Sequence, residues 1–205
     1  MKKLLLLIPL LLLGLHAARA QDAVFEFRID HQKGVGRIVI ALDADAAPGT
    51  VANFEKLLRK KFYTGLKVHR IIPHTFLQMG DPNTRRTDLA KYGIGGPGYT
   101  LPPEIHLRNT AGAVAMARLG DDINPARRSN GSQFYICLKP MPDLDGKYTV
   151  FGHVTQGMDV LDTLSTQPED TNDNPVPPIK IEAAYLSDHP PMRLNLKLNV
   201  WPFNR

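Results

Sequence analysis

The sequence predicts a mainly-β domain, either a closed barrel or a sandwich, with only two helices. Short runs in which apolar and polar residues alternate recur along most of the chain, as expected for strands with one buried face. Only two segments show helical spacing of apolar residues. Many short strands with few helices are typical of barrels and sandwiches. The 205 residues, of which 43% are hydrophobic, suffice for one substantial core.

Residues 1–20 have the pattern of a secretory signal peptide. A basic pair at positions 2–3 precedes an apolar run over 4–15, which is too short to span a bilayer comfortably. Positions 18–20 read Ala-Arg-Ala and fit a small-x-small cleavage site. We therefore expect an exported, periplasmic protein that begins at Gln21. The alternative reading is an uncleaved membrane anchor.

Charge and cysteine content limit the partners that we expect. Loss of residues 1–20 removes three basic residues and no acid, so the net charge falls from +5 to +2. Without a basic run or a zinc-ligand pattern, the chain gives no reason to expect a nucleic-acid partner. The single cysteine, Cys137, excludes an internal disulfide and lies in an apolar run. No cysteine stands at the cleavage site to carry a lipid, so we expect no membrane partner after cleavage.

Two strands and a helix open the predicted domain. Residues 23–30 alternate in polarity, Gly34 and Gly36 mark a turn, and 37–42 form the returning strand. A helix then begins at Pro48, a residue favoured in the first helical turn. At helical spacing its apolar face carries Val51, Phe54, Leu57 and Leu58.

Two polar side chains interrupt the apolar strands on either side of a Pro-containing turn. Alternate residues of a strand share a face, so Val68, Arg70 and Ile72 are expected on one side of the first strand. By the same rule Phe76 and Gln78 share a face of the second. Such polar side chains are costly to bury unless they have partners or a function. The alternative is an Arg whose stem packs while its head reaches solvent.

The rest of the domain continues as strands joined by loops. Residues 82–112 are rich in Gly and Pro and are expected to be mostly loop. A second helix is expected near 157–166, and the acidic, Pro-rich segment 168–178 is expected to be a surface loop. The remaining predicted strands are 113–117, 133–138, 149–154 and 179–186.

A C-terminal extension, residues 189–205, follows the domain. Apolar residues from Met192 to Val200 alternate with polar ones in the period of a strand. An ordered strand would require pairing with a sheet edge or with a second copy of the chain. The alternative is a mobile terminus, which is common at chain ends.

Three blocks of sequence, 68–81, 130–137 and 144–152, resemble the cyclophilin family of peptidyl-prolyl isomerases in their order and spacing. The resemblance extends over about residues 23–187. It implies a closed, eight-stranded antiparallel β-barrel capped by a helix at each end, in a domain over 21–188.

The resemblance also implies the site residues. Arg70 and Gln78 match the family's catalytic positions, and Gln133 matches a polar partner that orients the arginine and the substrate amide. Ala117 and Arg118 match the short strand that pairs with the substrate backbone. The other substrate-binding positions are Thr75, Phe76, Tyr135, Leu144 and Tyr148.

The implied reaction is rotation about an X-Pro peptide bond in unfolded or flexible polypeptides, which assists folding. Resonance in the amide sets a barrier of about 18–20 kcal/mol. Twisting the bond localises a lone pair on the prolyl nitrogen, and a fixed donor aimed at that nitrogen favours the twisted state. No bond is broken, so we expect no metal and no cofactor.

Several positions depart from the family pattern. Thr75 stands where Phe is usual, and Asp143 stands where cyclosporin-sensitive members have Trp. Tyr135 adds a hydroxyl where Phe is commoner, and the loop 119–129 is longer than the commonest version. These departures motivate a second hypothesis, a non-catalytic module on the same fold that binds proline peptides or acts as a chaperone.

Overall fold

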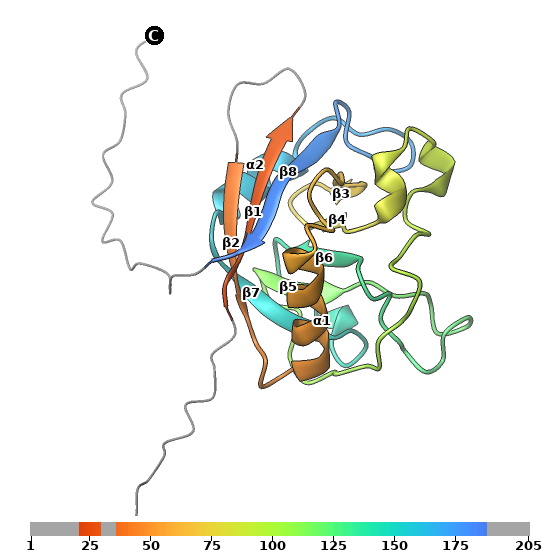
Figure 1. The fold of residues 1–205 in the computed structure, drawn as a ribbon. Helices are drawn as coiled ribbons and strands as arrows, with labels where there is room; N and C mark the ends of the chain where they lie inside the picture. Colours follow the sequence, from red (N-terminus) through yellow and green to blue (C-terminus); the bar gives the residue numbers. More distant parts are fainter. Residues whose placement is uncertain (1–20, 30–35, 188–205) are drawn as a thin grey trace, which may run out of the picture.

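A computed structural model of the protein describes residues 21–29 and 36–187, which form one strongly curled antiparallel sheet with two helices (Figure 1). The strands are β1 (Ala23–Ile29), β2 (Gly36–Leu42), β3 (Arg70–Ile72), β4 (Phe76–Met79), β5 (Ala113–Met116), β6 (Phe134–Cys137), β7 (Val150–Gln156) and β8 (Ile179–Leu186). The helices are α1 (Pro48–Arg59) and α2 (Met158–Ser165). The predicted signal peptide and C-terminal extension lie outside the described residues.

The eight strands form a single sheet in the order β3-β4-β6-β5-β7-β2-β1-β8. Every neighbouring pair is antiparallel, as predicted. The prediction of a closed barrel is not confirmed, because the edge strands β3 and β8 do not pair with each other. The segment just before β3 lies along β8 instead: Val68 N donates to Ile179 O over 3.0 Å, and Gly65 N to Ile181 O over 2.8 Å. The sheet is therefore an open, curled half-barrel.

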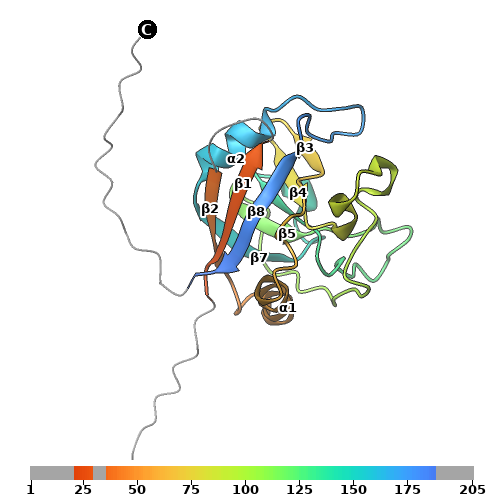
Figure 2. The same cartoon turned by 45° about the horizontal axis from the view of Figure 1, so that its top comes forward.

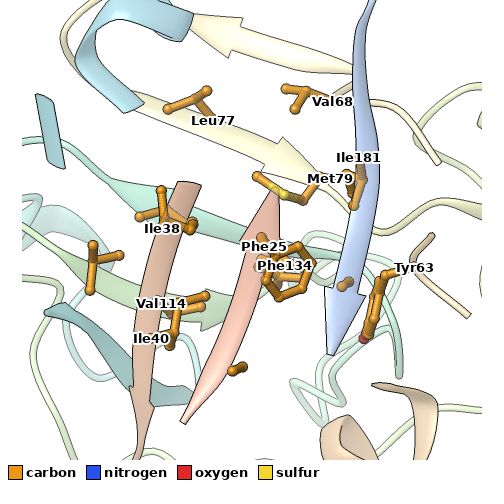
Figure 3. Close-up of a cluster of buried hydrophobic side chains, with 14 of the residues drawn as sticks. Phe25, Ile38, Ile40, Tyr63, Val68, Leu77, Met79, Val114, Phe134 and Ile181 are labelled. Atoms are coloured by element: carbon orange, nitrogen blue, oxygen red, sulfur yellow. The ribbon is translucent and has the colours of Figure 1, made fainter. Parts of the chain in front are cut away.

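The concave inner face of the sheet holds the main core (Figure 3). The alternation predicted for the first strand is confirmed, since Phe25 and Phe27 are buried inside. At the centre, Phe134 makes edge-on contacts with Phe54 and Tyr63, with ring centroids 5.3 and 5.7 Å apart. Aromatic pairs in this geometry contribute beyond their buried area. The core fixes the curvature of the strands that carry polar side chains on their other face.

The two helices lie at opposite ends of the curled sheet, α1 beside β8 and α2 against β2 and β4 (Figure 2). Helix α1 begins at Pro48, as predicted, but its N-cap residue Ala47 has no side chain that can cap it. The Glu104 carboxylate caps it from a distant loop, accepting hydrogen bonds from Gly49 N and Thr50 N over 2.9 and 2.8 Å. Burial alone would raise the pKa of Glu104, yet a hydrogen bond from the Thr50 hydroxyl together with the two main-chain bonds holds that pKa below its usual value.

Two parts of the chain differ from the sequence-based expectation. The segment 82–112 contains two short 3₁₀ helices, Pro82–Arg85 and Leu89–Lys91. Val68 does not share a face with Arg70, because it precedes β3 and is buried in the core. Its backbone follows β8 rather than the β3–β4 ladder, so strand alternation begins only at Arg70. In the described part of the chain, each helix is too short or too polar to cross a membrane.

Candidate active site

Three neighbouring strands place polar side chains in a row on the outer face of the sheet. Arg70 on β3 lies directly opposite Gln78 on β4, and Gln78 lies opposite Tyr135 on β6. Directly opposed residues of a sheet project to the same face. Their sequence neighbours Leu77 and Phe134 point the other way into the core. Because alternate residues of a strand point to opposite faces of the sheet, the same strands carry a core face and a site face.

This outer face is hollowed into a pocket of about 240 Å³. All of the sequence-predicted site residues except Thr75 and Gln133 line it, together with Met141, which was not predicted. The lining residues are Arg70, Phe76, Gln78, Ala117, Arg118, Tyr135, Met141, Leu144 and Tyr148.

Aromatic rings make the walls of the pocket largely apolar. The Tyr135 ring meets Phe76 edge-on at 6.2 Å and Tyr148 at 5.7 Å, measured between ring centroids. Behind them lies a second small core cluster, which includes Ala115 and Cys137. Burial raises the pKa of the Cys137 thiol to about 12, so this cysteine remains a neutral packing residue. Such a pocket suits a small apolar ring.

Arg70 brings a positive charge to the mouth of the pocket. Its Cζ lies 5.1 Å from the centroid of the Phe76 ring, and its Nε donates to Asp173 Oδ2 over 2.9 Å. The side chain is 46% exposed. Within the described ranges the two terminal guanidinium nitrogens donate to no protein group, so they can donate to a bound molecule.

A chain of amides holds Gln78 in place. Gln78 Nε2 donates to Gln133 Oε1 over 2.9 Å. Gln133 is buried and donates in turn to the main-chain oxygens of Gly93 and Gly95 over 2.9 and 2.7 Å. With its amide NH₂ engaged in this way, Gln78 keeps its Oε1 for the pocket side. Gln133 thus supports the site from behind rather than lining it.

Thr75 belongs to the hairpin turn and does not line the pocket. Its hydroxyl donates to Pro73 O over 3.0 Å, and its main-chain oxygen accepts from Leu138 N over 2.8 Å. These bonds fix the turn between β3 and β4. The prediction that Thr75 forms part of the substrate pocket is therefore wrong, because its side chain is engaged in the turn.

Arg118 acts as a brace at the rim of the pocket. Its Cζ lies 4.7 Å from the centroid of the Tyr148 ring, and its Nε donates to Lys147 O over 2.8 Å. Its Nη1 forms an ion pair of 2.6 Å with Asp121, which also pairs with Arg127 at 3.0 Å. The long loop 119–129 is thereby tied to the rim, although none of its residues lines the pocket.

The hydroxyl of Tyr135 points away from the pocket. It donates to Asn109 Oδ1 over 2.7 Å in a buried site, and the main-chain N of Asn109 donates to Asp145 Oδ1 over 2.7 Å. Burial raises the pKa of Tyr135, so the hydroxyl keeps its proton. This extra hydroxyl compared with Phe serves the fold and leaves the ring as the pocket wall.

Replacing Tyr135 by Phe is expected to lower the free energy of unfolding by about 1–3 kcal/mol, because Asn109 Oδ1 would lose its donor in a buried site. Tyr148→Phe is the matched control, since its hydroxyl donates to no residue that the structure describes. Urea denaturation of both variants checks the prediction. An unchanged free energy of unfolding in Tyr135→Phe would mean that the buried hydrogen bond does not form.

A second, more polar pocket of about 380 Å³ shares Arg70 and Gln78 with the first. Its other lining residues come from the segment before β3 and from two loops. They are His69, Leu89, Ala90, Tyr92, Gly93, Asn172 and Asn174. Arg70 and Gln78 therefore form the wall between the two pockets.

His69 is buried beside Arg70, and neither of its ring nitrogens makes a hydrogen bond to a described residue. Burial lowers its pKa to about 4, although the negative charge of Asp81 and the nearby Gln133 side chain oppose the shift. Gln133 cannot donate a proton to a His69 ring nitrogen, because its amide protons are donated to Gly93 and Gly95. His69 is therefore neutral at pH 7.

Because its folded-state pKa is depressed, His69 is expected to cost stability in acid. The unfolded chain, with a pKa near 6.5, binds more protons than the folded chain between pH 6.5 and pH 4. Stability contributed by the neutral ring is complete above pH 6.5 and falls by about 3 kcal/mol as the pH drops to 4. NMR titration of the His69 ring should show no protonation above about pH 5. A midpoint near 6.5 would contradict the burial.

Two residues of the site carried no signal in the sequence. Met141 lies in a short polar and Pro-rich connection and resembles any other loop apolar residue. Asp173 lies in the predicted surface loop 168–178, distant in sequence from the arginine that it contacts. Only the fold brings that loop to β3. Among residues 21–29 and 36–187 no cluster of His, Cys, Asp or Glu side chains has the arrangement of a metal site.

Comparisons with known proteins agree with this geometry. Residues 25–186 match the family described as cyclophilin type peptidyl-prolyl cis-trans isomerase/CLD. Peptidyl-prolyl cis-trans isomerase B of Bacillus subtilis is 43% identical over 132 residues, which cover 63% of this chain and 83% of that protein. Peptidyl-prolyl cis-trans isomerase-like 1 of Homo sapiens is 38% identical over 159 residues, which cover 76% of this chain and 90% of that protein.

Solved structures of a Cryptosporidium parvum cyclophilin type peptidyl-prolyl cis-trans isomerase are similar in fold. One has a TM-score of 0.70 and 27% identity, and the match covers 83% of this chain and 99% of that one. Another, determined in the presence of the dipeptide Ala-Pro, has a TM-score of 0.70 and 26% identity, with coverage of 82% and 100%.

Proposed function

Because the chain belongs to the cyclophilin-type peptidyl-prolyl cis-trans isomerase family, whose activity is rotation about X-Pro bonds, we propose that the pocket beside Arg70 is its active site. The proposed substrates are proline-containing segments of unfolded or flexible polypeptides. The observation that carries this proposal is a guanidinium fork at the mouth of an apolar pocket, with its terminal nitrogens available to a bound molecule.

In this mechanism the aromatic pocket holds the prolyl ring while the acyl side of the bond rotates. The walls formed by Phe76, Tyr135 and Leu144 exclude water and fix the ring. As the amide twists, the lone pair on the prolyl nitrogen localises and accepts a hydrogen bond from Arg70. The planar amide offers no such acceptor, so this donation favours the transition state over both ground states.

The size of the required effect is compatible with these groups. An acceleration of about 10⁵-fold corresponds to about 7 kcal/mol. One charged donor in a partly dry site supplies several kcal/mol, and orientation of the bound peptide supplies the rest. Gln78, whose amide nitrogen donates to Gln133, can accept an N–H of the substrate backbone at its Oε1. No bond breaks, so this mechanism requires no nucleophile and no cofactor.

The competing hypothesis of a non-catalytic peptide-binding module rests on Thr75 and Asp143. The contacts of both residues weaken it, since neither lines the pocket. Thr75 serves the hairpin turn, and Asp143 offers its main-chain oxygen to Lys147 Nζ at 2.9 Å. Arg70, Gln78 and Gln133 also argue against it, because they match the positions that the resemblance assigns to catalysis.

A protease-coupled assay on a short Xaa-Pro-Phe peptide separates the two functions. The protein is expected to accelerate the slow phase of cleavage at concentrations far below that of the peptide. A protein that binds the peptide but leaves the slow phase unchanged would support the non-catalytic module.

We further propose that the isomerase acts outside the cytoplasm, in the periplasm. The signal-peptide pattern of residues 1–20 supports this proposal. Expression of the full chain in a bacterium with two membranes, followed by fractionation and N-terminal sequencing, tests it. A periplasmic product that begins at Gln21 is expected, and an uncleaved cytoplasmic product would contradict it.

A further inference from the structure

We propose that Asp173 is a positioning residue that orients the Arg70 guanidinium, so that the loop 168–178 is part of the catalytic machinery. The inference rests on the proposed role of Arg70. It assigns a function to a loop that lies far from the catalytic strands in sequence and whose composition suggests only a surface connection.

Asp173 contacts two successive residues of β3. Its carboxylate accepts from Arg70 Nε over 2.9 Å, and its main-chain oxygen accepts from Ile71 N over 2.9 Å. The second bond sets the position of Asp173 relative to the edge strand, and the first then sets the plane of the guanidinium. An edge strand of three residues has few other contacts that could fix its arginine.

The loop is built to hold Asp173 in place. The Asp170 carboxylate accepts from Asn172 N over 2.8 Å and from Asn174 N over 3.0 Å. The main chain closes the same turn, with Asp170 N donating to Asn174 O and Asp173 N donating to Asp170 O. Asp173 has a φ of +63°, in the left-handed region that Asp and Asn adopt more readily than most residues. A disordered surface connection would not need this internal network.

Anchoring at Nε leaves the useful part of the fork unoccupied. With Nε bonded to Asp173 and the guanidinium against the Phe76 ring, the side chain loses most of its rotational freedom before substrate binds. The terminal nitrogens, which donate to no group among the described residues, are then available as preorganised donors. A donor that is already oriented stabilises the transition state without an ordering cost during the reaction. Loss of the anchor should lower kcat more than it raises KM.

The test uses Asp173→Asn and Asp173→Gly, both of which tolerate the left-handed backbone. Each is expected to lower kcat/KM for an Ala-Pro peptide by about tenfold, mainly through kcat, and to raise the mobility of the Arg70 Nε–H in NMR relaxation. Loss of an exposed ion pair should lower the melting temperature by less than about 3 °C.

Glu182→Gln is the matched control. It removes the negative charge from the ion pair of Arg28 Nε with Glu182, a pair of 3.1 Å whose side chains are 43% and 41% exposed, close to the 46% and 34% of Arg70 and Asp173. This variant should keep the wild-type kcat/KM. If both Asp173 variants also keep kcat/KM within about twofold of wild type, the inference is wrong.

A double-variant comparison separates this inference from the proposed function. Asp173→Asn is expected to have no further effect in an Arg70→Ala background, measured by NMR exchange at equimolar protein and peptide, which detects residual turnover. An equal fold-loss in both backgrounds would show that Asp173 acts independently of Arg70 and would overturn the inference. Full activity of Arg70→Ala alone would instead overturn the proposed mechanism.

Discussion

Replacing Arg70 by Ala is expected to lower kcat/KM for X-Pro isomerisation by at least about 100-fold, the loss typical of removing a transition-state donor. The prolyl nitrogen becomes an acceptor only when the amide twists, so loss of the donor raises the transition state without weakening the ground state equally. Arg70→Lys should also be poor, because a single ammonium cannot bond Asp173 and the substrate in the geometry of the planar fork.

The same variant should remain folded. The Arg70 side chain is 46% exposed, on an edge strand, and its ion pair with Asp173 is of the kind that contributes about 0–1 kcal/mol. Protease-coupled kinetics with calorimetry on the same samples gives both quantities. A melting temperature that falls in parallel with activity would assign Arg70 a structural role, and near-wild-type activity would remove it from the mechanism.

Replacing Phe134 by Ala is expected to lower the free energy of unfolding by about 3–5 kcal/mol. Phe134 is fully buried at the centre of the core (Figure 3). Its ring packs against Phe25, Phe54 and Tyr63 with centroids 5.6, 5.3 and 5.7 Å away. A cavity in this aromatic cluster cannot close without moving several strands. The loss is a large part of a typical stability of about 5–15 kcal/mol.

Urea denaturation measures this loss, with Phe134→Leu as the control that keeps most of the volume and should cost much less. The flanking residues serve the site rather than the main core, since Gln133 holds Gln78 and Tyr135 lines the pocket. At low temperature, the loss of activity per folded molecule of Phe134→Ala, expressed as a free energy, should therefore be smaller than its loss in free energy of unfolding. A free-energy loss below about 1 kcal/mol would mean that the core repacks around the missing ring.

Much of the fold followed from sequence periodicity. The strands and both helices lie within a few residues of their predicted positions, because each has a clear apolar face: Phe25 and Phe27 on β1, and Val51 and Phe54 on α1. Val68 did not follow the pattern, because a local period does not reveal that its backbone hydrogen-bonds to β8. The open edge between β3 and β8 likewise depends on long-range pairing that no local pattern encodes.

Most residues of the candidate site were predicted, but the hydrogen-bond partners that orient them were not. Arg70 and Gln78 were conspicuous because polar residues interrupt apolar strands, and the pocket contains both. The partners that orient them come from distant loops: Asp173 for Arg70 and the Gly93 and Gly95 carbonyls, through Gln133, for Gln78. A loop residue with an ordinary side chain carries no sign of which strand it will meet.

The central claim is that the pocket beside Arg70 both binds proline peptides and rotates the X-Pro bond. Two-dimensional NMR exchange spectroscopy on an Ala-Pro peptide with isotope-labelled protein tests both parts in one sample. We predict that the cis and trans peptide signals exchange in a time far shorter than the uncatalysed tens to hundreds of seconds. We also predict chemical-shift changes in the protein signals of Arg70, Phe76 and Tyr135. Shifts at these residues without faster exchange, or faster exchange with shifts elsewhere on the sheet, would contradict the account.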